Sequence, residues 1–164
     1  MKRERGGFRT LRRMQLLEGL GDDSYKSERK LPDSTRCPRC GASFHAGRWT
    51  WEAVPRGARE QLCPACHRIQ DRFPAGYVTL AGEFFLGHRD EILRLVRHCE
   101  EKEKAAHPLQ RIMNIEEVAE GVVVTTTDVH LARNIAERVH DAHKGSLAFR
   151  YSKKDNLLRA GWKR

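Results

Sequence analysis

Two pairs of cysteines constrain this chain more than any other feature of its sequence. Cys37 and Cys40 form one Cys-x2-Cys pair, Cys63 and Cys66 form a second, and 22 residues separate the pairs. This spacing is typical of four thiolates that bind one zinc ion in a tetrahedral shell. Such a shell leaves no position for water or a substrate. We therefore expect one structural zinc ion that stabilises the fold of residues 37–76.

Other roles for the cysteines are weaker. A thioredoxin-like redox site would explain one pair and leave the other without a purpose. His45 or His67 could supply a ligand, but four cysteines already satisfy the ion, so we expect both histidines beside the site or at the surface. The fifth cysteine, Cys99, shares a helical spacing with Ile92 and Val96 and is assigned to an apolar core.

The residues around the two pairs predict a small zinc domain. A hairpin is expected between the pairs, and residues 67–73 can form a short helix that ends at Pro74. This arrangement is treble-clef-like, and a plain zinc ribbon is the alternative. Trp49 and Trp51 could stack on exposed bases, but in so small a domain we favour a core role for both. The interleaved arginines are better candidates for outside contacts: Arg48, Arg56 and Arg59.

The remaining residues, 77–164, predict an α/β unit. Helical periodicity runs through 89–104 and 129–144, and Asp128 and Gly145 are suited to cap the second helix. The resulting order β-α-β-β-α-β is that of a ferredoxin-like domain, in which two helices cover one face of an antiparallel sheet. We thus expect an α+β chain with a four-cysteine zinc domain followed by this unit. The expected strands are 77–85, 109–118, 121–127 and 147–151.

The charge is positive and unevenly placed. The chain has 31 Lys and Arg against 22 Asp and Glu, a formal charge of +9. Residues 1–36 carry +4, 37–76 carry +3, 77–145 carry −3 and 146–164 carry +5. Basic ends around an acidic middle favour a polyanionic partner, since lysine and arginine release counterions when they neutralise phosphates.

The C-terminal segment is the strongest candidate for nucleic-acid contact. After a turn at 154–156, alternation places Leu158, Ala160 and Trp162 on one side of a final strand and basic residues on the other. An edge strand whose charges only discourage aggregation is the alternative. The predicted nucleic-acid-binding residues are Arg150, Lys153, Lys154, Arg159, Lys163, Arg164, Arg48 and Arg68.

The first 36 residues predict a basic tail without a core of its own. One short apolar cluster favours a helical stretch near residues 9–20 that orders on a partner, and a solubilising arm is the alternative.

Neither an enzyme nor a membrane protein is indicated. The chain has no P-loop, nucleophile elbow or dinucleotide fingerprint. His140 and His143 lie close enough on one expected helix to share an ion, but no third ligand is near, and we expect no catalytic residues. No apolar run approaches 18 residues and no secretory signal is evident, so we expect a cytoplasmic protein with reduced thiols.

Two segments resemble a known family. Cys37–Gly76, with Cys-Pro-x-Cys-Gly and Cys-Pro-Ala-Cys-His-Arg-Ile, resembles the zinc-binding region of the large-ribosomal-subunit nuclear export adaptors, a family originally named for nonsense-mediated decay. Val124–Ala132 resembles a short, stand-alone bacterial branch with this zinc region. The chain departs from the export adaptors in its shorter length and in having only two Cys-x2-Cys pairs. Nuclear export is therefore not carried over.

The resemblance implies a protein that docks on ribosomal RNA or a ribosomal subunit, with the four cysteines as metal ligands. Together with the charge pattern, it leads us to expect a non-enzymatic zinc adaptor acting in ribosome maturation, quality control or dormancy. No membrane and no small-molecule substrate is expected as a partner. The alternative is a protein–protein interaction module that has a structural zinc site and makes no direct RNA contact.

Overall fold

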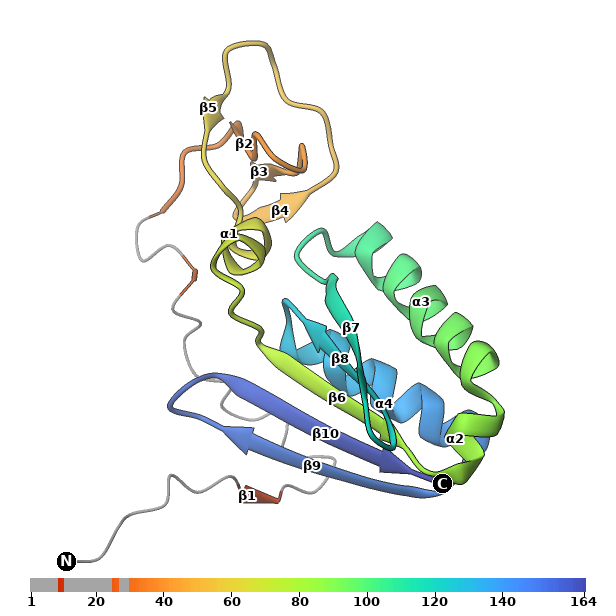
Figure 1. Cartoon of the computed structure of the whole chain (residues 1–164). Helices are drawn as coiled ribbons and strands as arrows, with labels where there is room; N and C mark the ends of the chain where they lie inside the picture. Colours follow the sequence, from red (N-terminus) through yellow and green to blue (C-terminus); the bar gives the residue numbers. More distant parts are fainter. Residues whose placement is uncertain (1–8, 11–24, 27–29) are drawn as a thin grey trace, which may run out of the picture.

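The computed structural model describes residues 9–10, 25–26 and 30–164. These residues form two β-sheets and four helices (Figure 1). We call residues 30–73, which contain the four cysteines, the cysteine module, and residues 75–164 the α/β unit. None of the helices in the described ranges is long and apolar enough to cross a membrane.

The α/β unit is built on a six-stranded sheet. Its strands, in spatial order, are β1 (Arg9–Thr10), β9 (Ser146–Ser152), β10 (Leu157–Lys163), β6 (Gly76–Ala81), β8 (Gly121–Thr126) and β7 (Ile112–Val118). Neighbouring strands are antiparallel except β10 and β6, which are parallel. The short β1 covers the outer edge of β9, whereas β7 forms the opposite edge.

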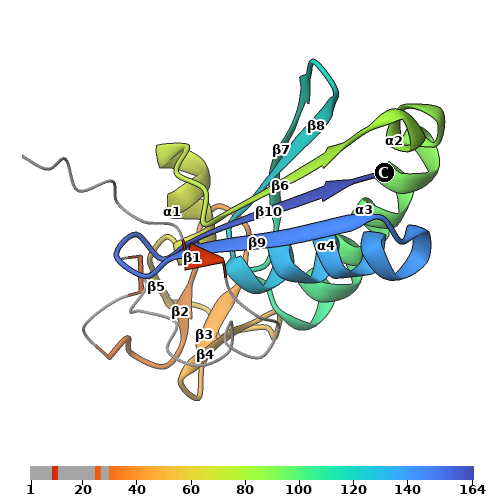
Figure 2. The ribbon, with the colours of Figure 1, turned by 90° about the horizontal axis from the view of Figure 1, so that it is seen from below.

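Two long helices cover one face of this sheet (Figure 2). They are α3 (Arg89–Ala106) and α4 (Val129–His143), and they pack against each other. Helix α4 begins at Asp128, whose Oδ1 accepts hydrogen bonds from the backbone N–H groups of His130 and Leu131 at 2.8 and 3.1 Å. The short α2 (Glu83–Gly87) follows β6. No helix of the described residues covers the other sheet face in Figure 2, and we call it the open face.

Alternation along the strands separates the core from the open face. Val78 and Leu80 of β6 point toward the helices and are fully buried, while their neighbours are half-buried on the other side. Strand β10 follows the same pattern with Leu158, Ala160 and Trp162 inside. Cys99 of α3 joins this core, as predicted.

The sheet order departs from the ferredoxin-like plan. The succession β6–α3–β7–β8–α4–β9 follows the predicted order along the chain. In the ferredoxin-like plan, however, β9 would pair with β6, and here β10 lies between them. Because β10 folds back on β9 through a tight turn, it runs opposite to β9 and parallel to β6.

The apolar residues of β10 explain its central place. Leu158, Ala160 and Trp162 are at most 3% exposed, so an edge position would leave this apolar side partly in water. The alternative of an exposed edge strand is therefore wrong. The expected strand at 77–85 also ends early, since Gly82 has a φ of +105° and α2 follows.

The cysteine module has a four-stranded sheet and one helix. Its strands, in spatial order, are β4 (Arg48–Thr50), β3 (Ser43–His45), β2 (Thr35–Arg36) and β5 (Arg59–Glu60). Strands β3 and β4 form the expected hairpin. Helix α1 (Pro64–Asp71) starts earlier than predicted, because Pro64 suits the first helical position and Cys63 caps the helix. The treble-clef or zinc-ribbon assignment stays a prediction.

The predicted helix near residues 9–20 lies mostly outside the described residues. Arg9 and Thr10 are described, and they form β1 rather than helix, paired with Tyr151 and Arg150. Extended backbone at these two residues satisfies hydrogen-bonding groups at the edge of β9.

Candidate metal centre and nucleic-acid interface

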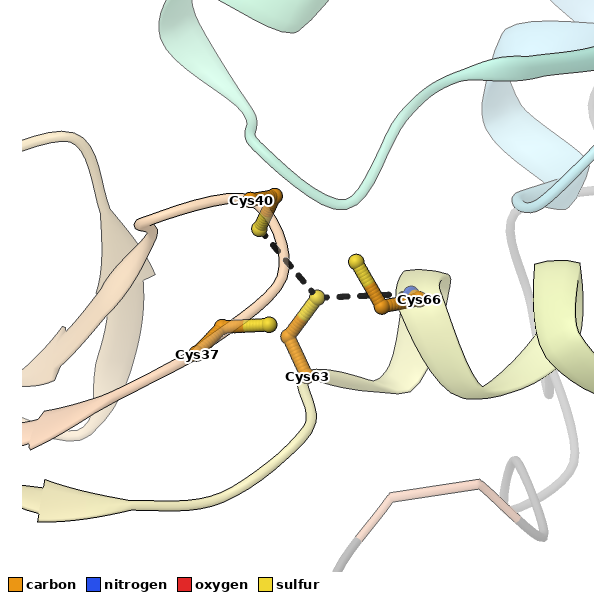
Figure 3. A group of neighbouring side chains, drawn as sticks. All are labelled: Cys37, Cys40, Cys63 and Cys66. Carbon is orange, nitrogen blue, oxygen red and sulfur yellow. Dashed lines mark hydrogen bonds between the residues drawn. The ribbon is translucent and has the colours of Figure 1, made fainter.

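Local backbone structure aims the four cysteines at one point. Cys37 and Cys40 lie in the turn after β2, where Gly41 adopts a φ of +80° and its N–H donates to the Cys37 carbonyl at 3.0 Å. Cys63 and Cys66 lie at the start of α1, where the Cys63 Sγ accepts a hydrogen bond from the Cys66 N–H at 3.4 Å. Figure 3 shows the four side chains converging from these two turns.

The sulfur atoms are spaced as metal ligands. All four Sγ atoms lie within 4.8 Å of one another, and those of Cys40 and Cys63 are 3.8 Å apart. In a tetrahedral zinc site with Zn–S bonds of about 2.3 Å, the sulfurs are separated by roughly 3.8 Å. The four cysteines could therefore hold a metal ion. Within the described ranges, no other group of three or more His, Cys, Asp or Glu side chains is arranged to do so.

Burial and hydrogen bonding act in opposite directions on these thiols. Burial raises the pKa of the Cys63 and Cys66 thiols because a thiolate loses its hydration there. Burial also acts to raise the pKa of Cys37, but N–H groups of Cys63, Cys40 and Arg39 outweigh it and lower the pKa to about 7. A bound cation would supply the charge that buried thiolates need.

An arginine from the α/β unit reaches into the cysteine cluster. Arg111, at the loop before β7, is 8% exposed. Its Nη1 donates to the Sγ of Cys66 at 3.3 Å. Its Nη2 donates to the Sγ atoms of Cys40 and Cys63 at 3.2 and 3.3 Å. The guanidinium thus covers one triangular face of the four sulfurs, with Cys37 at the remaining corner.

The backbone holds Arg111 in place. Its Nε donates to the Pro108 carbonyl at 2.8 Å, and its N–H donates to the Thr127 Oγ1 at 3.0 Å. The same Thr127 hydroxyl lies 2.6 Å from the Leu109 carbonyl. Arg111 is therefore a fixed positive charge beside the sulfurs and a contact between the two parts of the molecule. Hydrogen bonding to Cys66 and the negative charge of nearby thiolates raise the pKa of Arg111, against the effect of its burial.

Arg111 was not predicted as a site residue from the sequence. It stands 45 residues after Cys66, in a segment without a metal-binding pattern. In the sequence, Arg111 is simply a charged residue between Pro108 and a β-rich run, and nothing there indicates a contact with the cysteines.

The two tryptophans of the module have different roles. Trp49 is half-buried, packs against the cysteine cluster and meets the Phe44 ring edge-on at 5.7 Å between centroids, which supports its predicted core role. Trp51 is 40% exposed and its Nε1 donates to the Lys104 carbonyl at the end of α3, at 2.7 Å. Trp51 thus connects the module to the α/β unit and is not part of a core.

The histidines lie apart from the sulfurs. His67 faces Asp71, with 3.6 Å between Nε2 and Oδ2, and its ring meets Tyr25 edge-on. His45 is exposed at the end of β3. His143 lies between Phe84 and Trp162, away from any set of metal ligands in the described chain.

Four of the predicted nucleic-acid contacts gather at one end of the open face. Arg150 of β9 pairs in register with Arg159 of β10, so both side chains leave the sheet on the same face. Lys153 and Lys154 are exposed in the turn that joins these strands. Tyr77 of β6 is the next residue in this row, and the Arg159 guanidinium carbon lies 4.2 Å from its ring centroid.

The other predicted contacts lie elsewhere. Lys163 is at the opposite end of β10, 3.6 Å from the Glu120 carboxylate. The guanidinium carbon of Arg164 lies 4.1 Å from the Phe84 ring centroid, and the side chain donates to the His143 carbonyl. Arg48 is exposed on β4 of the cysteine module.

Arg68 cannot contact phosphate in this structure. It is 1% exposed on α1, its Nη1 donates to the Phe73 carbonyl at 3.1 Å, and the Tyr25 ring covers its guanidinium at 4.4 Å. The prediction for Arg68 is corrected accordingly: its guanidinium packs against the Tyr25 and Phe73 rings and donates to the Phe73 carbonyl just after α1.

No family model, curated protein or solved structure matches this chain. Any function proposed for it therefore rests on the geometry described above.

Proposed function

We propose that this protein is a non-enzymatic, zinc-stabilised adaptor that binds ribosomal RNA or a ribosomal particle. The observation that carries the proposal is the row of Arg150, Arg159 and Tyr77 across the open face, with Lys153 and Lys154 at its end. Cys37, Cys40, Cys63 and Cys66 would hold one zinc ion, whose role is to keep the cysteine module folded.

The side chains of this row, Arg150, Arg159 and Tyr77, are of the kinds that bind an unpaired nucleotide. The Arg159 guanidinium lies over the Tyr77 ring, and bases of single-stranded RNA are recognised mainly by stacking on such guanidinium planes and aromatic rings. The next row on the same face contains small residues, Ala148, Gly161 and Thr79. A Cβ atom added at Gly161 would meet nothing within 4 Å. A single RNA strand could therefore approach the sheet closely beside Tyr77.

The two ends of the open face differ in charge. Arg150, Lys153 and Lys154 supply positive charge near Tyr77, whereas Glu116 lies on β7 and Glu120 faces Lys163 at the far end. Phosphates would be attracted more strongly to the first end, because at the far end Glu120 offsets the charge of Lys163. We therefore place the RNA backbone along the β9–β10 turn.

Salt-dependent RNA binding tests the proposal. We would measure the affinity of the metal-loaded full chain for labelled single-stranded ribosomal RNA fragments at several salt concentrations. The double variant K153E/K154E should bind at least tenfold more weakly, and its salt slope should fall by roughly 0.7 for each phosphate that the variant no longer neutralises. Sedimentation of the protein with ribosomal subunits in cell lysate should decrease in parallel.

The matched control is R97E/K102E, which makes the same charge change on the exposed side of α3. It should retain nearly the wild-type affinity. Equal losses of affinity in the two double variants would show that only net charge matters. Sedimentation that resists both salt and ribonuclease would instead favour the protein–protein interaction module.

A further inference from the structure

A cleft lies where the cysteine module meets the α/β unit. It measures about 850 Å³, within the usual range for binding sites. One wall comes from the β3–β4 hairpin and α1, and the other comes from the loop before β7 and from Asp128 at the start of α4. None of the four cysteines lines the cleft, and none of the basic residues of the open face does so. The cleft is therefore a separate site.

The hairpin wall combines aromatic and positive side chains. Phe44, Arg48 and Trp49 line it together. Lys26 and Lys30 line the same cleft and are exposed. Rings beside cations are the combination that binds nucleotides, because the rings stack on the base and the cations attract the phosphate.

The opposite wall contains a polar atom without a partner. Gln110 lines the cleft, and its Oε1 is buried with no hydrogen-bond partner among the described residues. A buried carbonyl oxygen that accepts no hydrogen bond costs free energy, and a rotation of the Gln110 amide into the cleft would let a donor of the ligand reach it. Asp128, in contrast, is already occupied by two backbone N–H groups.

We propose that this cleft receives one unpaired nucleobase of the bound RNA. The base would lie against the Phe44 and Trp49 wall, donate an N–H to the Gln110 Oε1, and leave its phosphate near Arg48. This inference rests on the proposed function and adds a second, base-specific contact to it.

A series of contacts connects the cleft to the basic turn of the open face. The Leu158 N–H at the start of β10 donates to the Ala75 carbonyl at 2.9 Å. Two residues before Ala75, the half-exposed Phe73 stacks on Tyr25 with 6.0 Å between centroids, and Tyr25 lines the cleft. A single RNA strand could therefore pass from the Lys153–Lys154 turn over these rings to the cleft.

The test combines base removal with two cleft variants. A labelled RNA fragment that binds the metal-loaded full chain would be compared with a series of the same fragment, each carrying one abasic nucleotide. At the position whose base enters the cleft, we expect wild-type affinity to fall about tenfold, as is typical for one stacked base. R48A and Q110L should each bind the intact fragment about fivefold more weakly. Because Gln110 contacts the base itself, Q110L should lose little more when that base is absent, whereas the loss in R48A should persist because Arg48 contacts the phosphate.

The control is R56A, which removes an exposed arginine of the same module that does not line the cleft. It should match the wild type on both RNAs. Wild-type affinity of R48A and Q110L for intact RNA, or a Q110L loss that simply adds to the loss from base removal, would overturn the cleft. If RNA binds and K153E/K154E weakens it while the cleft variants do not, only the cleft proposal fails. If the wild type binds no RNA, the proposed function fails with it.

Discussion

The two parts of this molecule keep their folds by different means. The α/β unit has 19 buried core residues from its sheet and helices. In the cysteine module, the corresponding cluster has four buried residues, and three of them are cysteines: Cys37, Cys63, Cys66 and Ala65. A cluster this small does not by itself offset the conformational entropy lost on folding, so we expect a metal ion held by the four cysteines to stabilise the module.

The largest effect should follow from removing one thiol. Cys63→Ser should release the metal and unfold the cysteine module, because structural zinc contributes about 10–16 kcal/mol of apparent binding free energy in zinc-finger peptides. The α/β unit should keep its far-UV circular dichroism, since its core does not include these cysteines. Metal content and nuclear magnetic resonance spectra would be recorded together. A variant with one equivalent of metal would contradict the four-cysteine site.

The reverse experiment removes the largest core side chain of the α/β unit. Trp162 is 1% exposed, and Trp162→Ala should lower the free energy of unfolding of this unit by about 3–5 kcal/mol. Urea unfolding, followed by circular dichroism, measures the decrease, while the bound metal is quantified in the same samples. Leu86→Ala is the control, since Leu86 lies in the same unit and is 57% exposed. Metal loss in Trp162→Ala without urea would show that the two parts do not fold independently.

Arg111 provides the sharpest test of that independence because it belongs to one part and contacts the other. Arg111→Met keeps much of the side-chain volume but removes the hydrogen bonds to three sulfurs. We expect about 10- to 100-fold weaker metal binding, the usual effect of losing a partner of the ligands. Competition with a chelator measures it. The metal affinity of Arg111→Lys should lie between those of the wild type and Arg111→Met. Equal affinity in all three proteins would show that Arg111 does not support metal binding.

The smallest effect concerns pH. A side-chain hydrogen bond to Asp128 raises the pKa of His130 above its ordinary value of 6.5, against the opposing effect of burial. Protonated His130 therefore stabilises the folded state below about pH 6.5, and this contribution is lost as pH rises through the raised pKa. Both side chains are partly exposed, so solvent screens the pair.

The pH prediction is tested as a difference between proteins. The wild type should exceed His130→Asn in free energy of unfolding near pH 6, and the gap should close toward pH 9. Metal release affects both proteins and cancels in the comparison. A gap that widens as pH rises would contradict the assignment.

Structural features that depend on residues close together in the sequence were predicted from local sequence patterns. The paired cysteines, the helical spacing of Ile92, Val96 and Cys99, and the alternation around Trp162 all describe one segment and its surroundings. The four cysteines, the two long helices and the buried side of β10 were accordingly identified from sequence.

Features that depend on competition between distant segments were not predictable in this way. Whether β9 or β10 pairs with β6 depends on how much free energy is gained by burying the apolar side chains of each strand. The sequence pattern of a single strand does not indicate this difference. Arg111 and Arg68 are arginines, which are expected at the surface by default. Their burial depends on sulfurs and aromatic rings that only the folded chain brings near.

The position of β10 also determines when the α/β unit can fold during synthesis. Residues 37–66 leave the ribosome early, so a cysteine module that binds a metal ion could fold while later residues are still being added. The large sheet cannot, because β10 lies between β9 and β6 and is the last of its strands to be made. Until Trp162 emerges, the apolar sides of β6 and β9 have no strand to join them. Nascent chains stalled before residue 157 should therefore combine a folded cysteine module with an incomplete α/β unit whose exposed apolar residues bind chaperones.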